Sequence, residues 1–502
     1  MSEEKFKKII SHAKEYGFIF QSSEIYDGLS AVYDYGQNGV LLKNNIKEYW
    51  WKSMTQFNEN IVGIDSAIFS HPTTWKASGH LDAFNDPLID NKDSKKRYRA
   101  DNLIEDFINK IEKKLSKEIE KNRKRFGESF DQETFLSTND RAKKYKAEIN
   151  DLKSNLNKAL NEENLDLLKE IIISKNISCP VSGTTNWTDV KQFNLMFNTK
   201  VGASAESATE LFLRPETAQG IYVNYQLVQG AMRMKIPFGI AQIGKAFRNE
   251  IIARNFIFRT REFEQMEMQY FVKPGTDDSI MKEWKEKRFQ FYLDQLCIVE
   301  KKLRYKEHGE NELAHYAKEA WDIEYEFPFG WSEIEGIHNR TDYDLSRHEE
   351  FSGKNLNYFD QPNNERFLPY IIETSAGLNR MLLTVLADAY WEDEENNRVV
   401  MKLHPRLAPV KAVVCPLVKK DGLPEKAREI MDILKPHFKI VYDQQGSIGK
   451  RYYRQDEAGT PFGITVDHQS SEDNTVTLRH RDTQKQDRVS IDKLVNTIQE
   501  NI

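Results

Sequence analysis

The clearest helical pattern in the chain follows Gly377. Apolar side chains recur there at i, i+3, i+4, i+7, i+8 and i+11, the spacing of one buried helical face. They are Leu378, Met381, Leu382, Val385, Leu386 and Ala389. The segment from Tyr370 to Ala389 therefore predicts a strand, a turn of small residues and a buried helix, in that order. Arg380 falls off the apolar stripe, in the first turn of the helix.

A second pattern alternates with a period of two between Phe263 and Phe271. Such alternation predicts a strand with one packed face and one polar face. The polar positions are Gln265, Glu267 and Gln269, and the apolar ones are Met266, Met268 and Tyr270. Residues 238–250 predict a partner strand that ends in the segment 247–250. We expect a hairpin that presents carboxylates and amides to a cavity.

The connection of this hairpin is rich in arginine. Arg248 ends the first strand, and Arg254, Arg259 and Arg261 follow it. Guanidinium groups bind phosphate oxygens through paired hydrogen bonds, and an aromatic ring such as that of Phe258 or Phe263 can stack on a purine. The pattern suits a polyanion that carries a flat base. A surface hairpin held by ion pairs is the alternative interpretation of this segment alone.

Two strand-to-helix junctions also carry chemistry. Arg214 and Glu216 lie at one of them, where side chains can face a pocket. Gly377 and Arg380 lie at the other, where a glycine permits close backbone approach and a helix N-terminus attracts phosphate. A capped core helix with a surface arginine is the plainer alternative for the second junction.

The composition shifts along the chain divide it into four parts. Residues 1–100 mix strands with glycine-rich turns, and residues 101–178 form a charged helical insertion. Residues 179–403 alternate strand-like and helix-like segments and contain a second charged stretch at about 275–320. After the prolines near residue 405, residues 404–502 predict a compact α/β domain.

Composition excludes several classes of protein. The 502 residues are 39% hydrophobic and 30% charged, enough to bury a large core, and the net charge of −6 excludes a globally basic nucleic-acid coat. The three cysteines, Cys179, Cys297 and Cys415, share no paired spacing, so we expect no disulfides and a reducing compartment. Without a long apolar stretch or a secretory signal, we expect a cytoplasmic protein that does not enter membranes.

Taken together, the motifs resemble those of the class II aminoacyl-tRNA synthetases. The helix and strand that end at Pro237 resemble motif 1, a dimer-forming element. The segment Phe247–Glu250 with its loop and returning strand resembles motif 2, and Ser375–Arg380 resembles motif 3. Within the class, several long segments resemble the single-chain, homodimeric glycyl-tRNA synthetases: 97–101, 193–197, 213–220, 258–267 and 446–461. The resemblance covers nearly the whole chain.

The resemblance implies an α+β fold, with an antiparallel sheet flanked by helices, and a site for ATP and Mg²⁺. It implies that Arg248 and Arg380 are catalytic, that Phe263 stacks on the adenine and that Glu333 lies on the magnesium side. The implied ATP-binding residues are Arg248, Asn249, Glu250, Phe258, Arg259, Thr260, Arg261, Glu262, Phe263, Glu333, Ile334, Gly377, Leu378, Asn379 and Arg380.

The resemblance also implies a glycine site. Its residues would be Arg99, Glu216, Phe263, Glu264, Gln265, Met266, Glu267, Glu373, Thr374, Ser375, Ala376 and Gly377. Because an apolar pocket separates substrates that differ by one methylene by only ~1–3 kcal/mol, the protein must exclude a Cβ sterically. Carboxylates that grip the ammonium can form such a wall, and clustered glutamates raise one another's pKa until the ligand binds.

Some members of the family carry a four-cysteine zinc cluster. The corresponding positions here are Asn91, Ser94, Cys179 and Ser182. One thiolate does not hold a structural zinc, which takes four protein ligands, so we expect no zinc.

The last domain resembles the anticodon-binding domain of class IIa synthetases. We expect it to bind tRNA through Lys450, Arg451 and Arg454, helped by Arg479 and Arg481, with Tyr452, Tyr453 and Phe462 available to stack on bases.

These expectations define a homodimeric glycine–tRNA ligase that forms glycyl-adenylate from glycine and ATP and transfers glycine to the 3′ end of tRNA(Gly). Two alternatives are a class IIa synthetase for another small amino acid and a catalytically inactive, synthetase-like nucleic-acid-binding subunit. The second should lack ATP-binding residues, whereas Arg248, Glu250, Arg259, Glu333 and Arg380 are all present.

Overall fold

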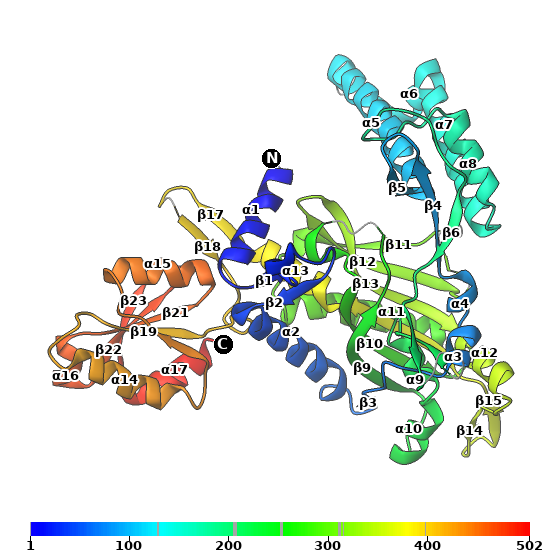
Figure 1. Cartoon of the computed structure of the whole chain (residues 1–502). Helices are drawn as coiled ribbons and strands as arrows, with labels where there is room; N and C mark the ends of the chain where they lie inside the picture. The colour runs from blue at the N-terminus through cyan, green and yellow to red at the C-terminus, as the bar shows by residue number, and fades with distance from the viewer. Residues whose placement is uncertain are drawn as a thin grey trace. The chain divides into compact units, whose positions relative to one another are not determined.

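The computed structural model describes residues 2–127, 130–203, 208–251, 255–309, 313–314, 316–396 and 398–502 (Figure 1). The chain forms two compact units. The first joins Met1–Ser78 to Phe197–Ile502, and the second is Gly79–Met196. Arg254, one of the expected phosphate ligands, lies outside the described residues. In the part of the chain that the structure describes, no helix is both long and apolar enough to cross a membrane.

A seven-stranded sheet forms the centre of the first unit. Its strand order is β11-β12-β13-β16-β10-β9-β3, antiparallel throughout except for the parallel pair β3–β9. The strands are β3 (Ile61–Gly63), β9 (Phe238–Phe247), β10 (Glu262–Val272), β11 (Leu303–Glu307), β12 (Glu319–Phe327), β13 (Gly330–Thr341) and β16 (Tyr370–Gly377). The hairpin expected from the period-two pattern is therefore confirmed as β9–β10.

Helices cover both faces of this sheet, as expected for an α+β protein. One face packs against α2 (Gln37–Thr55), α11 (Asp277–Asp294) and α13 (Leu378–Ala389) in the largest apolar core. The other face packs against α9 (Ala218–Tyr222) and leaves room for a cavity. The predicted helix after Gly377 is confirmed as α13, and its apolar stripe is buried. The expected turn of small residues is not found, because β16 ends at Gly377 and α13 begins at Leu378. The remaining elements of the first unit, before the C-terminal domain, are α1 (Ser2–Glu15), β1 (Ile19–Gln21), β2 (Tyr33–Tyr35), α3 (Pro72–Ala77), β7 (Asn198–Val201), β8 (Thr209–Phe212), α10 (Tyr225–Met232), α12 (Tyr343–Ser352), β14 (Tyr358–Asp360), β15 (Glu365–Phe367), β17 (Tyr390–Asp393) and β18 (Arg398–Met401).

A bulge in β13 decides which side chains face the cavity. The pairing of β12 with β13 slips between Ile323 and Glu324, so that Ile334 is an extra residue on β13. The extra residue allows Glu333 and Gly336, three positions apart, to line the same cavity.

The expected dimer element before Pro237 needs a correction. The helix is present as α10, but the described segment 233–237 contains no strand. The strand that follows, β9, lies inside the sheet between β10 and β3 and so offers no free edge. The strand at that edge of the sheet is β3, which follows the long helix α2.

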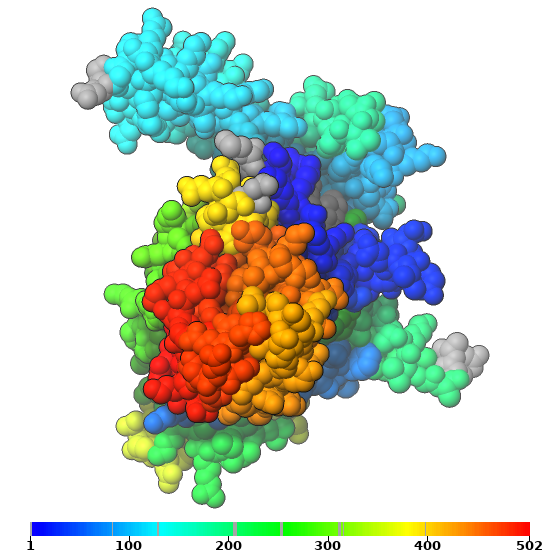
Figure 2. Space-filling view, turned by 90° about the vertical axis from the view of Figure 1, so that its left-hand side faces the viewer, coloured from blue at the N-terminus to red at the C-terminus, as the bar shows by residue number. Residues whose placement is uncertain are grey.

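The C-terminal part of the first unit has a sheet and an apolar core of its own. The strand order is β20-β19-β21-β22-β23. Figure 2 faces this part, which is coloured from orange to red. Its elements are β19 (Ala412–Pro416), α14 (Leu423–Leu434), β20 (Ile440–Tyr442), α15 (Ile448–Ala458), β21 (Phe462–Val466), α16 (His468–Asp473), β22 (Thr475–His480), β23 (Gln486–Ser490) and α17 (Leu494–Glu500).

The second unit combines a three-stranded sheet, β5-β4-β6, with helices around a separate apolar core. The charged helices expected at 101–178 lie within it. Its elements are α4 (His80–Ala83), β4 (Asn85–Asn91), β5 (Lys96–Arg99), α5 (Ala100–Phe126), α6 (Gln132–Thr138), α7 (Asp140–Asn161), α8 (Leu165–Ser174) and β6 (Lys191–Asn194).

Candidate active site

A polar cavity of about 330 Å³ opens on the face of the central sheet that α9 partly covers. The β8–α9 junction, the β9–β10 hairpin and its loop, β13, β16 and the start of α13 contribute to its wall. Its lining residues are Glu216, Arg248, Glu250, Ile257, Phe258, Arg259, Thr260, Phe263, Gln265, Glu267, Tyr316, Glu333, Gly336, His338, Arg340, Glu373, Ser375, Gly377, Asn379 and Arg380. Most of the expected site residues thus meet in one place.

Two rows of cross-strand neighbours form the floor of the cavity. In the first row, Ser375 on β16 pairs with Gly336 on β13 and with Glu267 on β10. In the second row, Glu373 pairs with His338 on one side and with Gln269 on the other. Because alternate residues of a strand share a face, both rows point into the same space.

Glu267 is a buried carboxyl with one unused oxygen. Its side chain accepts a hydrogen bond from Ser375 Oγ at 2.9 Å through Oε1, while Oε2 has no hydrogen-bond partner among the described residues. Burial, reinforced by the charges of Glu373 and Glu216, raises the pKa of Glu267 to about 8. The carboxyl is therefore mainly protonated at pH 7, and it must release its proton before it can pair with a cation.

Glu373 is equally buried but fully partnered. Oε1 accepts from His338 Nδ1 at 2.8 Å, Oε2 accepts from Gln269 Nε2 at 2.8 Å, and Arg340 Nη1 lies 3.3 Å from both oxygens. Although burial opposes ionisation, Arg340 and His338 outweigh it and lower the pKa of Glu373 to about 2. The four donor contacts fill the acceptor positions of this carboxylate.

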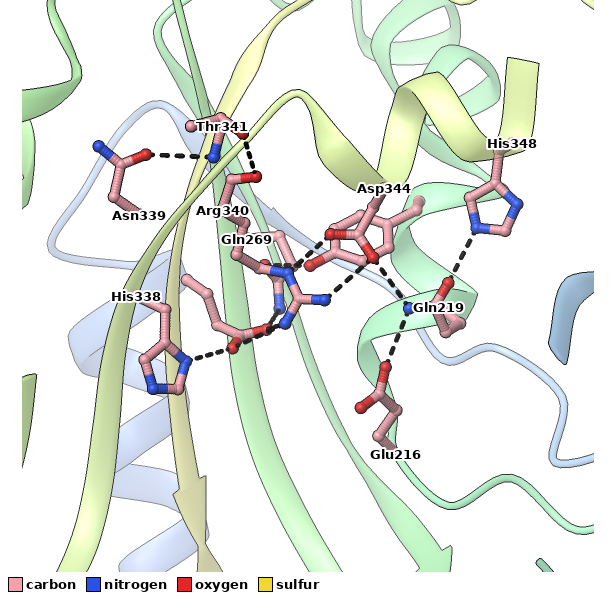
Figure 3. A network of polar contacts seen from close by, with 11 residues as sticks. Glu216, Gln219, Gln269, His338, Asn339, Arg340, Thr341, Asp344 and His348 are labelled. Atoms are coloured by element: carbon pink, nitrogen blue, oxygen red, sulfur yellow. Dashed lines mark hydrogen bonds and ion pairs between the residues drawn. The ribbon is translucent and has the colours of Figure 1, made fainter. Parts of the chain in front are cut away.

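A polar network behind the cavity fixes these groups (Figure 3). Arg340 donates to both oxygens of Asp344 on α12, at 2.7 and 3.0 Å. Gln219 on α9 donates to Asp344 at 3.2 Å and to Glu216 at 2.9 Å. Because the Gln219 amide nitrogen donates, its oxygen accepts from His348 Nε2 at 2.9 Å. The network connects Glu216 to Arg340 through α9 and α12.

Three arginines line another part of the cavity wall. The Arg248 guanidinium lies 5.3 Å from the ring centroid of Phe263, and its Nε donates to the Pro215 carbonyl at 3.0 Å. Arg259 pairs with Glu250 at 2.9 Å.

Arg380 is the third arginine of this wall. It lies over the Phe258 ring at 4.3 Å and pairs with Glu333 at 3.1 Å. The charge of Arg380 lowers the pKa of Glu333. Such a wall suits phosphate oxygens and a stacked base.

Several expected site residues point away from the cavity. Glu264 faces α2, where Lys43 and Lys47 pair with it at 2.5 and 2.9 Å, and Arg261 donates to the carbonyls of Glu250 and Ser30. Glu262 pairs with Lys245 on β9. The side chains that do not line the cavity are Asn249, Arg261, Glu262, Glu264, Met266, Ile334, Thr374, Ala376 and Leu378. On the strands, the period of two explains these placements, because neighbours of cavity residues face the opposite core.

Sequence reasoning missed five lining residues: Ile257, Tyr316, Gly336, His338 and Arg340. The last three alternate along β13, directly after the segment that contains Glu333. This period-two spacing was a usable signal.

Arg99 lies in the second unit, at the end of β5. There it pairs with Asp86 at 2.8 Å and with Asp101 at 2.5 Å. Its expected contact with glycine stays a prediction.

The four positions that correspond to zinc ligands come together in the second unit. Ser94 Oγ lies 3.4 Å from Cys179 Sγ, and the Ser182 hydroxyl donates to Asn91 Oδ1 at 2.9 Å. The Tyr98 hydroxyl also lies 3.2 Å from the thiol, which is buried. Hydrogen bonds therefore connect these positions.

The expected basic surface of the C-terminal domain needs a correction. Arg451 is only 3% exposed, and its guanidinium donates to the carbonyls of Pro416 and Gly446 at 2.5 and 2.7 Å. The side chains of Tyr452, Phe462, Arg479 and Arg481 are also buried. Lys450, Tyr453 and Arg454 are exposed, and Arg454 pairs with Asp443 at 2.6 Å.

Comparison with known proteins finds similarity along nearly the whole chain. Three family models match: glycyl-tRNA synthetase insertion domain 1 at residues 86–195, tRNA synthetase class II core domain (G, H, P, S and T) at 197–389, and anticodon binding domain at 411–501. A glycine–tRNA ligase of Chlorobaculum tepidum is 51% identical over 97% of both chains. One of Treponema denticola is 49% identical over 99% of this chain and 97% of its own, and one of Staphylococcus haemolyticus is 49% identical over 98% of both.

Proposed function

The chain belongs to the glycine–tRNA ligases, a family of class II aminoacyl-tRNA synthetases, and on that premise we propose that its cavity joins glycine to ATP as glycyl-adenylate. One observation carries the proposal. The cavity combines a buried carboxyl that has an unused oxygen, Glu267, with a wall of three arginines. The first suits the ammonium of an amino acid, and the second suits the phosphates of ATP.

Glycine binds above the two rows of the sheet. Glu267 Oε2 accepts a hydrogen bond from the ammonium, and the nearby charges of Glu216 and Glu373 add to the attraction. Ser375 Oγ donates to the other oxygen of Glu267. The strand backbone at Gly336 and Ser375 lies close beneath, so a Cβ on the substrate meets the wall. Rejection of alanine is then steric, which separates the two substrates better than an apolar pocket does.

ATP binds along the arginine wall, with its adenine on Phe263. Adenylate formation is an attack of the glycine carboxylate on the α-phosphorus, with pyrophosphate as the leaving group. Two anions must approach each other, and Arg248 lies where it can contact both. Arg259 and Arg380 hold the outer phosphates. Positioning and charge neutralisation supply the catalysis, and no covalent enzyme intermediate is needed.

Glu333 fits a magnesium ion. Its carboxylate lines the cavity, its side chain is 48% exposed, and Arg380 keeps it ionised. Mg²⁺ prefers a carboxylate or two together with substrate phosphates and water. When bound beside Glu333, it would neutralise charge on the phosphates of ATP.

The second substrate is tRNA(Gly), which receives glycine on the 3′-terminal adenosine. The exposed groups Lys450, Tyr453 and Arg454 on α15 give the C-terminal domain a small basic and aromatic surface for this RNA. Because the whole chain carries a net charge of −6, RNA binding depends on such local surfaces.

The enzyme acts as a homodimer. An apolar surface on the first unit is formed by α10, α2 and β3, and on it Leu227 is 72% exposed and Met232 is 59% exposed. Exposed apolar surfaces of this kind mark interfaces, and a second copy of the same chain is the commonest partner.

An aminoacylation assay tests the proposal. The protein should transfer radiolabelled glycine to tRNA(Gly) only when ATP is present. The matched control is tRNA whose terminal ribose has been oxidised with periodate, which removes the acceptor hydroxyl. No transfer to intact tRNA, or equal labelling of oxidised tRNA, would contradict the proposed reaction.

A further inference from the structure

His338 lines the cavity but is not among the residues to which the proposed function assigns a task. It lies on β13 opposite Glu373, and its Nδ1 is 2.8 Å from Glu373 Oε1. Because the Glu373 carboxylate is ionised, it accepts, and the imidazole donates. Gln269, on β10, donates a hydrogen bond to the other oxygen of Glu373. The carboxylate is thus clamped between the two strands that flank its own.

Gly336 makes the position of the His338 ring possible. A Cβ built on Gly336 would lie 2.9 Å from Cε1 and 3.0 Å from Nε2 of His338. A methyl group there would therefore move the ring, and with it the donor to Glu373. The backbone at Gly336 is not in the left-handed region, so the restriction comes from the ring alone.

Other charged groups also face this pair. Arg340 contacts both oxygens of Glu373 at 3.3 Å, longer than the 2.8 Å of His338 and Gln269. Asp322, on β12, pairs with His308 at 2.8 Å, and the His308 ring lies 6.4 Å from the ring of His338. The contact of His338 with Oε1 of Glu373 is therefore shorter than that of Arg340 with the same oxygen.

We propose that His338 is a positioning residue for glycine: it holds Glu373 at the distance from Glu267 that the ammonium requires. The inference rests on the proposed function. Without the imidazole donor, Oε1 of Glu373 keeps, among the described residues, the longer Arg340 contact alone, and the carboxylate is held less firmly. The affinity for glycine then falls, whereas the ATP wall, built on Arg248, Arg259 and Arg380, is unaffected.

Two substitutions separate the hydrogen bond from the bulk of the ring. His338→Asn keeps an N–H near the place of Nδ1, whereas His338→Leu keeps bulk and removes the donor. In ATP–pyrophosphate exchange, His338→Leu should raise KM for glycine about 10- to 100-fold, the range for loss of a hydrogen bond to a charged group, and leave KM for ATP within about twofold. His338→Asn should remain within about threefold of the wild type in both constants.

The possible outcomes distinguish a failure of the inference about His338 from a failure of the proposed function. A wild-type protein without glycine-dependent exchange refutes the proposed function and, with it, the inference. An active wild type with unchanged KM in His338→Leu refutes only the inference, as does a folded His338→Asn variant that is as impaired as His338→Leu. Thermal melting of each variant establishes that it is folded.

Discussion

Glu267 and Glu373 lie on neighbouring strands of one sheet face, yet their surroundings hold them in opposite protonation states at neutral pH. Glu373 has Arg340 and His338 as partners, which lower its pKa to about 2. Glu267 accepts a hydrogen bond from Ser375 on one oxygen, and burial with the nearby charge of Glu373 raises its pKa to about 8. In the free protein the pair therefore carries one negative charge, on Glu373. It gains a second when Glu267 loses its proton to bind the ammonium of the substrate.

The protonation of Glu267 predicts a pH-dependent affinity for glycine. Below pH 8, the ammonium must displace a proton from this carboxyl, so binding releases a proton. KM for glycine should fall as pH rises from 6.5 to 8, by at most tenfold per pH unit, and level off above that. Calorimetry in buffers of different ionisation heat should detect the released proton at pH 7.

Glu267→Gln is the control for this prediction. The amide resembles the protonated carboxyl and does not ionise, so the variant should bind glycine weakly and with no pH dependence between 6.5 and 8. A flat profile in the wild type, or no proton release at pH 7, would mean that Glu267 is already ionised in the free enzyme.

Arg248 should be essential for adenylate formation. In the proposed reaction Arg248 lies beside both reacting anions, so Arg248→Ala should lower exchange about 100- to 1000-fold, as when one donor to a developing charge is removed. Lys245→Ala is the matched control, because this exposed lysine lies on β9, three residues before Arg248, and does not line the cavity. Near-wild-type exchange in Arg248→Ala would refute the assignment.

The apolar surface on α10 predicts which substitutions disrupt the proposed dimer. A double substitution, Leu227→Glu with Met232→Glu, places charges on two exposed apolar side chains and should convert a dimer into a monomer in analytical ultracentrifugation. Ile433→Glu is the control, since Ile433 is also exposed but lies on α14. A dimeric double variant, or a monomeric wild type at micromolar concentration, would contradict the proposed interface.

Neighbouring basic residues on α15 should behave differently. Lys450→Ala removes an exposed cation and should weaken tRNA binding several-fold, reduce its salt dependence and leave the melting temperature unchanged. Arg451→Ala leaves the carbonyls of Pro416 and Gly446 without a donor and should lower the melting temperature. Equal effects of both substitutions on tRNA binding, with no effect on melting, would contradict the placement of Arg451.

Local periodicity was sufficient for the elements that carry the site. The apolar stripe of α13 and the alternation of β10 each follow one repeat, and the structure confirms both. The polar face of β10 was identified for the same reason: Gln265 and Glu267 share a face because they are two residues apart.

The order of strands across the sheet could not be predicted in this way. His338 and Arg340 reach Glu373 only because β13 lies beside β16, a long-range pairing without a local signal. The bulge at Ile334 also has no visible sequence mark, although it brings Glu333 and Gly336 to one face. The burial of Arg451 was missed for another reason. Charge suggested a surface, whereas the helical spacing of Arg451, Tyr452 and Asp456 marks a buried face.

The measurement that tests the central claim most directly is ATP–pyrophosphate exchange with each of the twenty amino acids, without tRNA. We predict exchange with glycine alone, because in the proposed site Glu267 binds the ammonium while the strand backbone excludes a Cβ. Exchange with alanine or serine would contradict the assignment of the pocket. No exchange with any amino acid, in a folded protein, would contradict adenylate formation and favour a synthetase-like protein that only binds nucleic acid.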